Sequence, residues 1–146
     1  MDEHAQFIAA AYDEALASYR AGGLPIGSVL VRDGAIIGRG HNQRVQKSDP
    51  IAHGEMDCLR NAGRQRSYRD TVIYTTLSPC MMCTGTIIQF KIPTVVIGES
   101  VNFPGNKDFL QSRGVTVVDL ADARCIDLMA RFIREKPQLW NEDIAE

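Results

Sequence analysis

Apolar and small residues recur three or four positions apart through the first part of the chain, from residue 3 to residue 20. This spacing predicts an amphipathic helix, and Gly22-Gly23 marks its end. Two β-like runs follow at residues 26–32 and 35–40, and Asp33-Gly34 between them suits a type I′ turn. We therefore expect an opening helix followed by an antiparallel hairpin.

The rest of the chain alternates between helical and extended patterns. Helix-forming residues at 53–61 stop at Gly63, and Ser78-Pro79 precedes a second helix that we expect from about Cys80 to Phe90. The remaining elements are expected as strands at 71–76, 94–98 and 115–119 and as helices at 107–112 and 121–134.

This order of elements predicts an α/β fold. A hairpin followed by strands that alternate with helices indicates a single mixed β-sheet with helices on both faces. A length of 146 residues suits one compact domain, which we expect to span residues 1–146. Pro137 is expected to end the last helix, and the polar, acidic tail after it contains only Leu139, Trp140 and Ile144 as large apolar residues.

Composition places the chain among ordinary globular proteins. Hydrophobic residues make up 45% and charged residues 23%, and the longest apolar runs fall far short of the ~20 residues of a membrane span. A net charge of −2 and a pI near 5.9 provide no positive field for a polynucleotide partner. The acidic start lacks a signal pattern, which indicates a reducing compartment, where the four cysteines would persist as thiols. We therefore expect a cytoplasmic protein without a membrane span.

Two short motifs carry the candidate chemistry. HGE at residues 53–55 opens one expected helix, and PCMMC at residues 79–83 opens another. Two thiolates on one helical turn can converge on a single ion, and a histidine from another segment supplies a third ligand. Three protein ligands leave the fourth position of zinc to water, whose pKa zinc lowers to about 7. We expect one Zn²⁺ per chain, held by His53, Cys80 and Cys83.

Glu55 is the candidate proton carrier. It lies two residues beyond His53, close enough to reach the same water while staying outside the metal ligands. A carboxylate placed there can take a proton from the water and return protons to a ring nitrogen and a departing amine. This is the chemistry of hydrolytic deamination, and the two motifs together match the H-x-E and P-C-x-x-C signature of zinc deaminases.

Each motif has a simpler interpretation when taken alone. An isolated C-x-x-C is more often a structural zinc half-site or a redox pair. The order of the motifs, their separation and the strand before the second one favour the catalytic interpretation. Cys58 and Cys125 stand among apolar neighbours on expected helices, and we interpret them as buried small hydrophobic side chains.

Stretches around and beyond the two motifs complete a family pattern. They are GGLPIG at 22–27, GRGHN at 38–42, TTLSPCMMCTG at 75–85, GESVNF at 98–103 and WNEDI at 140–144. With them, the chain resembles the fungal-type cytosine deaminases of the cytidine deaminase-like superfamily almost from end to end. The resemblance implies the cytidine deaminase-like fold, conversion of the free base cytosine to uracil and ammonia, and a homodimer.

The resemblance also implies how a pyrimidine base is bound. It implies that Asn42 hydrogen-bonds the pyrimidine edge, that the N–H of Gly54 meets the ring carbonyl, and that Asp143 accepts from the exocyclic amine. It further implies that the ring is walled by Ile26, Phe103 and Trp140. From the residues alone, Asn42 is equally well a turn residue. A tryptophan in a tail is usually a packing anchor and a carboxylate there is usually solvated, so the roles of Trp140 and Asp143 depend on the resemblance.

Positions near the expected pocket leave the substrate open. Ile51-Ala52, Met81 and residues 89–91 differ from the fungal pattern, so isocytosine or a related amino-heterocycle is an alternative to cytosine. A tRNA adenosine deaminase shares the zinc motifs, but it should present a basic surface to RNA, whereas this chain ends in acidic residues.

Two further interpretations concern features outside the pocket. Arg64, Arg66 and Arg69 form a local basic cluster, which we interpret as part of a solvated loop. A non-catalytic zinc scaffold is the last alternative for the chain as a whole. Glu55 argues against it, because a structural zinc site usually fills all four positions and needs no proton carrier.

Overall fold

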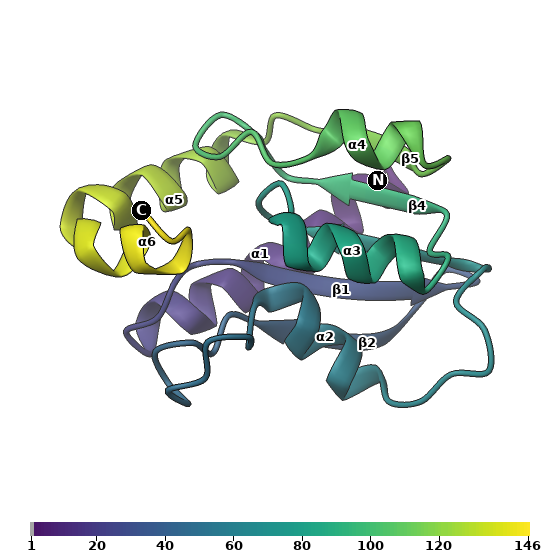
Figure 1. Ribbon diagram of the computed structural model, residues 1–146, viewed down its shortest axis with the longest axis horizontal. Helices are drawn as coiled ribbons and strands as arrows, with labels where there is room; N and C mark the ends of the chain where they lie inside the picture. Colours follow the sequence, from purple (N-terminus) through teal and green to yellow (C-terminus); the bar gives the residue numbers. More distant parts are fainter. Residues whose placement is uncertain (1) are drawn as a thin grey trace.

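The chain folds around one β-sheet (Figure 1). The structure is a computed structural model that describes residues 2–146. The strands within these residues are β1 (Gly27–Arg32), β2 (Ala35–His41), β3 (Thr71–Thr75), β4 (Thr94–Ile97) and β5 (Thr116–Asp119). The helices are α1 (Glu3–Arg20), α2 (Gly54–Ala62), α3 (Met81–Gln89), α4 (Lys107–Ser112), α5 (Ala123–Glu135) and α6 (Pro137–Asp143).

The sheet is mixed, as the order of the elements predicts. Its strand order is β2-β1-β3-β4-β5. β1 runs antiparallel to both β2 and β3, whereas β3, β4 and β5 run parallel to one another. The turn between β1 and β2 has positive φ at Asp33 (50°) and Gly34 (73°), which a type I′ turn requires. The predicted hairpin is therefore confirmed.

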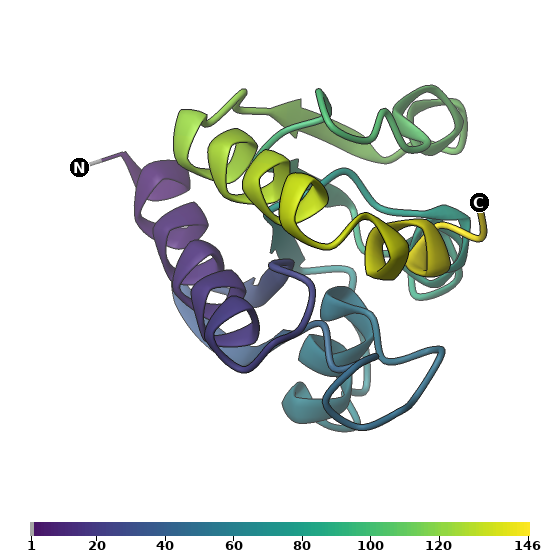
Figure 2. The same cartoon turned by 90° about the vertical axis from the view of Figure 1, so that its left-hand side faces the viewer.

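Helices cover both faces of the sheet (Figure 2). α1 and α5 lie side by side on one face, where Phe7 and Cys125 belong to one apolar cluster. α2, α3 and α4 cover the other face, and Leu59, Ile87 and Leu110 bring them into a second cluster. The core thus has two layers, one on each side of the sheet, and the predicted fold class is confirmed.

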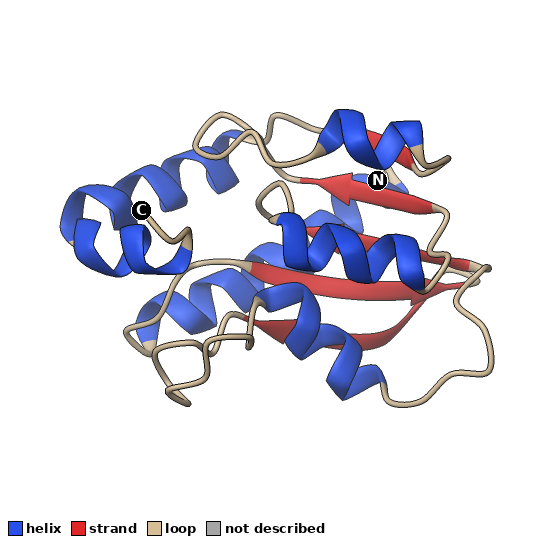
Figure 3. Ribbon diagram, in the orientation of Figure 1, coloured by secondary structure: helices blue, strands red, loops and turns tan. Residues whose placement is uncertain are grey.

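The last helix, α6, lies in a segment where the sequence pattern shows no helical repeat. Pro137 ends α5, as expected, but it also occupies the first turn of α6, where its missing N–H is tolerated. A helix of seven residues is too short for a helical period to be recognised. Packing explains it instead, because Trp140 is buried in a third apolar cluster with Met129 and Phe132 of α5. Figure 3 places α6 beside the end of the sheet toward which β4 points.

Other expectations about buried and exposed residues agree with the structure. Cys58 and Cys125 are buried, and burial raises the pKa of both thiols, that of Cys125 to about 12. Arg64, Arg66 and Arg69 are exposed in the loop that follows α2. Within residues 2–146, none of the helices is both long enough and apolar enough to cross a membrane.

Candidate metal-binding and catalytic site

The N-termini of α2 and α3 supply the three candidate metal ligands. His53 is the N-cap residue of α2, and Cys80 is the N-cap residue of α3. Neither side chain makes a capping hydrogen bond to its own helix. Cys83 follows on the first turn of α3 and is fully buried. The local sequence thus presents these three side chains away from their own helices, where they can meet an outside ligand.

The three donor atoms converge. One ligand atom from each of His53, Cys80 and Cys83 lies within 4.8 Å of the others. Nδ1 of His53 is 3.4 Å from Sγ of Cys80 and 3.9 Å from Sγ of Cys83. Tetrahedral zinc holds sulfur and nitrogen donors about 3.5 Å apart, given its usual bond lengths. The donor types and their separations therefore fit zinc.

The other ring nitrogen of His53 faces a carboxylate. Its Nε2 is 3.6 Å from Oδ1 of Asp143, on the last turn of α6. Because Nδ1 faces the sulfurs and Nε2 faces Asp143, the ring orientation is defined on both sides. Histidine ligands of metals commonly pair their second nitrogen with a carboxylate in this way.

The neighbours of Cys80 favour the thiolate form of its side chain. Hydrogen bonds link the Cys80 sulfur to Cys83 and to Nδ1 of His53. They lower the pKa of Cys80 to about 4, although burial opposes the shift. The same Cys80 interaction, with burial, raises the pKa of Cys83. Burial alone would lower the pKa of His53, but Cys80 and Asp143 raise it to about 9. The Cys80 sulfur is thus held as a thiolate, the form that binds metals.

Glu55 lies in the first turn of α2, and only 4% of it is exposed. Burial raises the pKa of its carboxyl to about 7, and the nearby Cys80 sulfur adds to this shift. A small cavity of about 20 Å³, room for about one water molecule, is lined by Glu55 together with His53 and Cys80. The carboxyl group therefore faces the same space as the candidate metal ligands.

Residues implied as walls and contacts of the base mostly meet at this cavity. Ile26, Phe103, Trp140 and Asp143 all line it. The rings of Phe103 and Trp140 pack edge to face, with centroids 6.1 Å apart and planes at 88°. A wider hollow of about 500 Å³ shares Phe103 and Asp143 with the cavity, and through it the cavity faces the surface.

The other two implied substrate contacts do not line the cavity. Asn42 is fully buried, and its side chain is engaged at both ends, since Nδ2 donates to Oδ1 of Asp143 (3.2 Å) and Oδ1 accepts from the N–H of Arg44 (2.9 Å). Gly54 lies against Ile26, the residue before β1, and an added Cβ would stand 3.0 Å from its carbonyl oxygen. This close approach explains why glycine occupies the position between His53 and Glu55.

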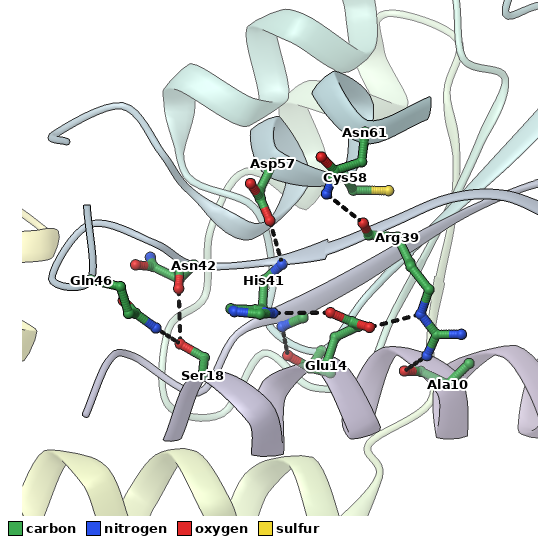
Figure 4. A network of polar contacts seen from close by, with 12 residues as sticks. Ala10, Glu14, Ser18, Arg39, His41, Asn42, Gln46, Asp57, Cys58 and Asn61 are labelled. Atoms are coloured by element: carbon green, nitrogen blue, oxygen red, sulfur yellow. Dashed lines mark hydrogen bonds and ion pairs between the residues drawn. The ribbon is translucent and has the colours of Figure 1, made fainter. Parts of the chain in front are cut away.

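A polar network holds the end of β2, just before Asn42 (Figure 4). The Glu14 carboxylate on α1 binds Nε of Arg39 (2.7 Å) and Nδ1 of His41 (2.9 Å). On the other side, Oδ2 of Asp57 on α2 accepts from the N–H of His41 (3.0 Å). β2 is therefore tied to helices on both faces of the sheet, which places Asn42 relative to α2.

Three cavity residues were not expected from the sequence. They are Leu77, Ser78 and Ile144. Leu77 and Ser78 directly precede the PCMMC motif, so their position next to the metal ligands was a usable signal. Ile144 follows Asp143 and is one of only three large apolar residues in the tail, which could also have indicated a contact.

Comparisons with known proteins give consistent results. Residues 1–99 match the family model of the cytidine and deoxycytidylate deaminase zinc-binding region. The chain is 56% identical over 139 residues to the cytosine deaminase of Candida albicans, covering 93% of each. It is 35% identical over 147 residues to a tRNA-specific adenosine deaminase of Streptococcus pyogenes serotype M18, covering 92% of each. The structure of a guanine deaminase from Nitrosomonas europaea superposes with a TM-score of 0.74 at 22% identity, over 86% of this chain and 82% of that one.

Proposed function

The chain belongs to the cytidine and deoxycytidylate deaminase family, and we propose on that basis that it is a zinc-dependent hydrolase that converts cytosine to uracil and ammonia. One observation carries the choice of substrate, namely the 56% identity to a cytosine deaminase along 93% of both chains. The relative that acts on tRNA is more distant, at 35% identity. We also propose that the 146 residues act as one deaminase domain, since the helices and strands described in residues 2–146 form one body around a single sheet, with α6 packed on α5.

One zinc ion per chain is the cofactor. The proposed ligands are Nδ1 of His53 and the sulfurs of Cys80 and Cys83, whose geometry fits this metal. Zinc held by three protein ligands lowers the pKa of water and so supplies a nucleophile near neutral pH. Asp143 fixes the ring of His53 from the other side.

Glu55 is proposed to move the protons. Its carboxyl faces the cavity from the first turn of α2, beside the metal ligands but separate from them. It takes a proton from the water that adds to the carbon bearing the amine, and passes it to the adjacent ring nitrogen. A second proton then goes from the new hydroxyl group to the amine, the C–N bond breaks, and ammonia leaves. Water and cytosine thus give uracil and ammonia.

The base is proposed to lie between the walls Ile26, Phe103 and Trp140, with Asp143 and Asn42 at its polar edge. Support comes from the cavity lining and from the hydrogen bond that joins the Asn42 and Asp143 side chains. The short terminal helix α6 carries two of these contacts, Trp140 and Asp143. The base is proposed to enter from the wider hollow that shares Phe103 and Asp143 with the cavity.

Replacing Asp143 with alanine should lower kcat/KM for amine-bearing bases by about 10- to 100-fold, the effect of losing a hydrogen bond to a charged group. Thermal stability should stay close to wild type, and the kinetics are measured on zinc-saturated protein, because loss of the carboxylate beside His53 also weakens metal binding. Trp140→Ala is the contrasting variant, because removal of a buried ring should lower the melting temperature. Steady-state kinetics decide the role of Asp143: wild-type kcat/KM for every accepted base would show that this carboxylate does not read the substrate.

The substrate class is tested by measuring ammonia release from cytosine, isocytosine and adenosine in parallel. We expect cytosine to be deaminated with the highest kcat/KM. A preference for isocytosine would select the alternative raised by Ile51-Ala52 and Met81, and turnover of adenosine alone would contradict the proposal. Absence of ammonia from all three bases with zinc-loaded protein would favour the non-catalytic scaffold.

Deamination of tRNA is the second candidate, and the 35% identity to tRNA-specific adenosine deaminases is the observation in its favour. The charge distribution is against it. The net charge is −2, and Glu142 and Glu146 in the tail are exposed. Filter binding with tRNA at physiological salt separates the two functions, because a tRNA enzyme should bind through many phosphate contacts.

A homodimer and a cytoplasmic location complete the proposal. The face formed by α2, α3 and α4 exposes large apolar side chains at Met81, Phe90 and Phe109, which supports association of two copies through it. A mass of 16.2 kDa in sedimentation equilibrium would contradict the dimer. None of the four cysteines is in a disulfide, which supports the cytoplasm, and cell fractionation tests this location.

A further inference from the structure

Glu99 is a fully buried acidic residue for which the proposed reaction has no role. It follows β4, and none of its surface is exposed. Burial of a carboxylate is unfavourable unless hydrogen bonds compensate for the lost water. Three donors do so here. Oε2 accepts from the N–H groups of Val101 (2.7 Å) and Asn102 (2.9 Å), and Oε1 accepts from Nδ2 of Asn102 (3.0 Å). The loop at residues 99–102 therefore wraps around its own carboxylate.

The same loop is bonded to the segment that precedes the metal ligands. The N–H of Ser78 donates to the carbonyl oxygen of Glu99 (2.9 Å), and Oγ of Ser78 donates to the carbonyl oxygen of Pro104 (3.0 Å). Ser78 lines the cavity and stands two residues before Cys80. These two hydrogen bonds fix the position of the loop relative to the segment that carries Cys80.

Asn102 connects the loop to α5 as well. Its Nδ2 donates both to Glu99 and to the carbonyl oxygen of Ile126 (3.0 Å) in α5. α5 leads through Lys136 into α6, which carries Trp140. One amide group therefore joins the buried carboxylate to the helix pair that forms the opposite wall of the cavity.

Phe103 is the residue whose position depends on these bonds. It comes directly after Asn102, lines the cavity, and meets the ring of Trp140 edge to face. Its apolar ring makes no hydrogen bond of its own, so the backbone of the loop determines where it stands. We propose that Glu99, acting through Asn102, is a positioning residue that holds Phe103 against Trp140 and so sets the affinity of the cavity for the base.

The proposal rests on the proposed function only in taking the cavity as the site of the base. Glu99 touches none of the groups that move protons. It therefore affects binding of the substrate and of the transition state equally. Loss of such uniform binding raises KM and leaves kcat nearly unchanged. A defect in the catalytic segment would instead lower kcat.

Paired amide and acid exchanges test the carboxylate–amide contact. Glu99→Gln places an NH₂ group among three donors, so one contact is lost if the amide nitrogen faces Asn102 and two are lost if it faces the backbone N–H groups. Asn102→Asp places a second carboxylate against Glu99. In the double variant E99Q/N102D, the new amide can donate to the new carboxylate while its oxygen still accepts from the two backbone N–H groups. Asp108→Asn is the matched control, because Asp108 is exposed on the neighbouring helix α4.

Each single variant is expected to raise KM for cytosine about tenfold, the effect of roughly one charge-assisted hydrogen bond, with kcat within about twofold of wild type. Trp140 is the sole tryptophan, so its fluorescence reports the contact with Phe103 without any turnover. Its emission should shift in both single variants and not in D108N. The double variant should recover the part of the KM and emission changes that comes from the two adjacent carboxylates in N102D, whereas the bond of Asn102 to the carbonyl oxygen of Ile126 stays lost.

Three results would overturn the proposal. The first is wild-type KM and emission in both single variants, and the second is a fall in kcat at unchanged KM. The third is a KM for the double variant that is raised by the product of the two single-variant effects. If one single variant does not fold, KM and Trp140 emission of the other single variant, compared with those of the double variant, still test the proposal. If the wild-type protein deaminates no base, the proposed function fails, whereas Trp140 emission in the same variants still tests the positioning.

Discussion

Replacing Glu55 with glutamine should lower kcat for cytosine by about 10²- to 10⁴-fold, the contribution typical of a general acid–base group, while zinc content stays at one per chain. Glutamine keeps the size of the side chain and removes only its ability to exchange a proton. Glu55 is buried at the cavity, where bulk water cannot easily take over the proton transfer. The three donor atoms of the metal cluster do not include it, so the metal should remain bound.

Asp57→Asn is the matched control for this variant. Asp57 stands two residues farther along α2, is equally buried, and accepts a hydrogen bond from the N–H of His41 that an asparagine oxygen can still accept. Its kcat should stay within a few-fold of wild type. Single-turnover kinetics with metal-loaded Glu55→Gln provides the measurement, and near-normal turnover would refute the role of Glu55.

Replacing Cys83 with alanine should reduce bound zinc to about a tenth of wild type or less, because even groups that only support metal ligands contribute 10- to 100-fold to metal affinity. Activity should fall with the metal. Only His53 and Cys80 would be left to hold the ion, and alanine at position 83 would place an apolar methyl group where a buried sulfur now faces Nδ1 of His53.

Cys58→Ala is the control for loss of a buried thiol as such. Cys58 is as fully buried as Cys83, but its sulfur faces the carbonyl oxygen of Gly38 in β2. This variant should lose some stability through the smaller side chain and keep its zinc. Metal analysis of both purified proteins makes the comparison, and full zinc retention in Cys83→Ala would exclude this cysteine as a ligand.

Features that depend on a few consecutive residues could be predicted from the sequence. The hairpin between β1 and β2 depends on Asp33-Gly34, whose positive φ angles follow from the turn itself. The pairing of Cys80 and Cys83 is similar, because a separation of three positions on a helix places both side chains on one face. Their convergence with His53 could be inferred because the two segments open the helices that come after β2 and β3, and these strands end at the same side of the sheet.

The tertiary structure alone decided how distant parts of the chain meet. Asn42 and Asp143 are 101 positions apart, and their side chains are joined only because β2 and α6 end at the same side of the sheet. α6 has too few residues to reveal a helical period, and burial of Trp140 against α5 stabilises it. Likewise, Glu99 reads in the sequence as an ordinary charged residue after a strand, and its burial depends on the loop folding over it. Local spacing determines local geometry, whereas contacts between distant segments depend on strand order and packing, which no short pattern encodes.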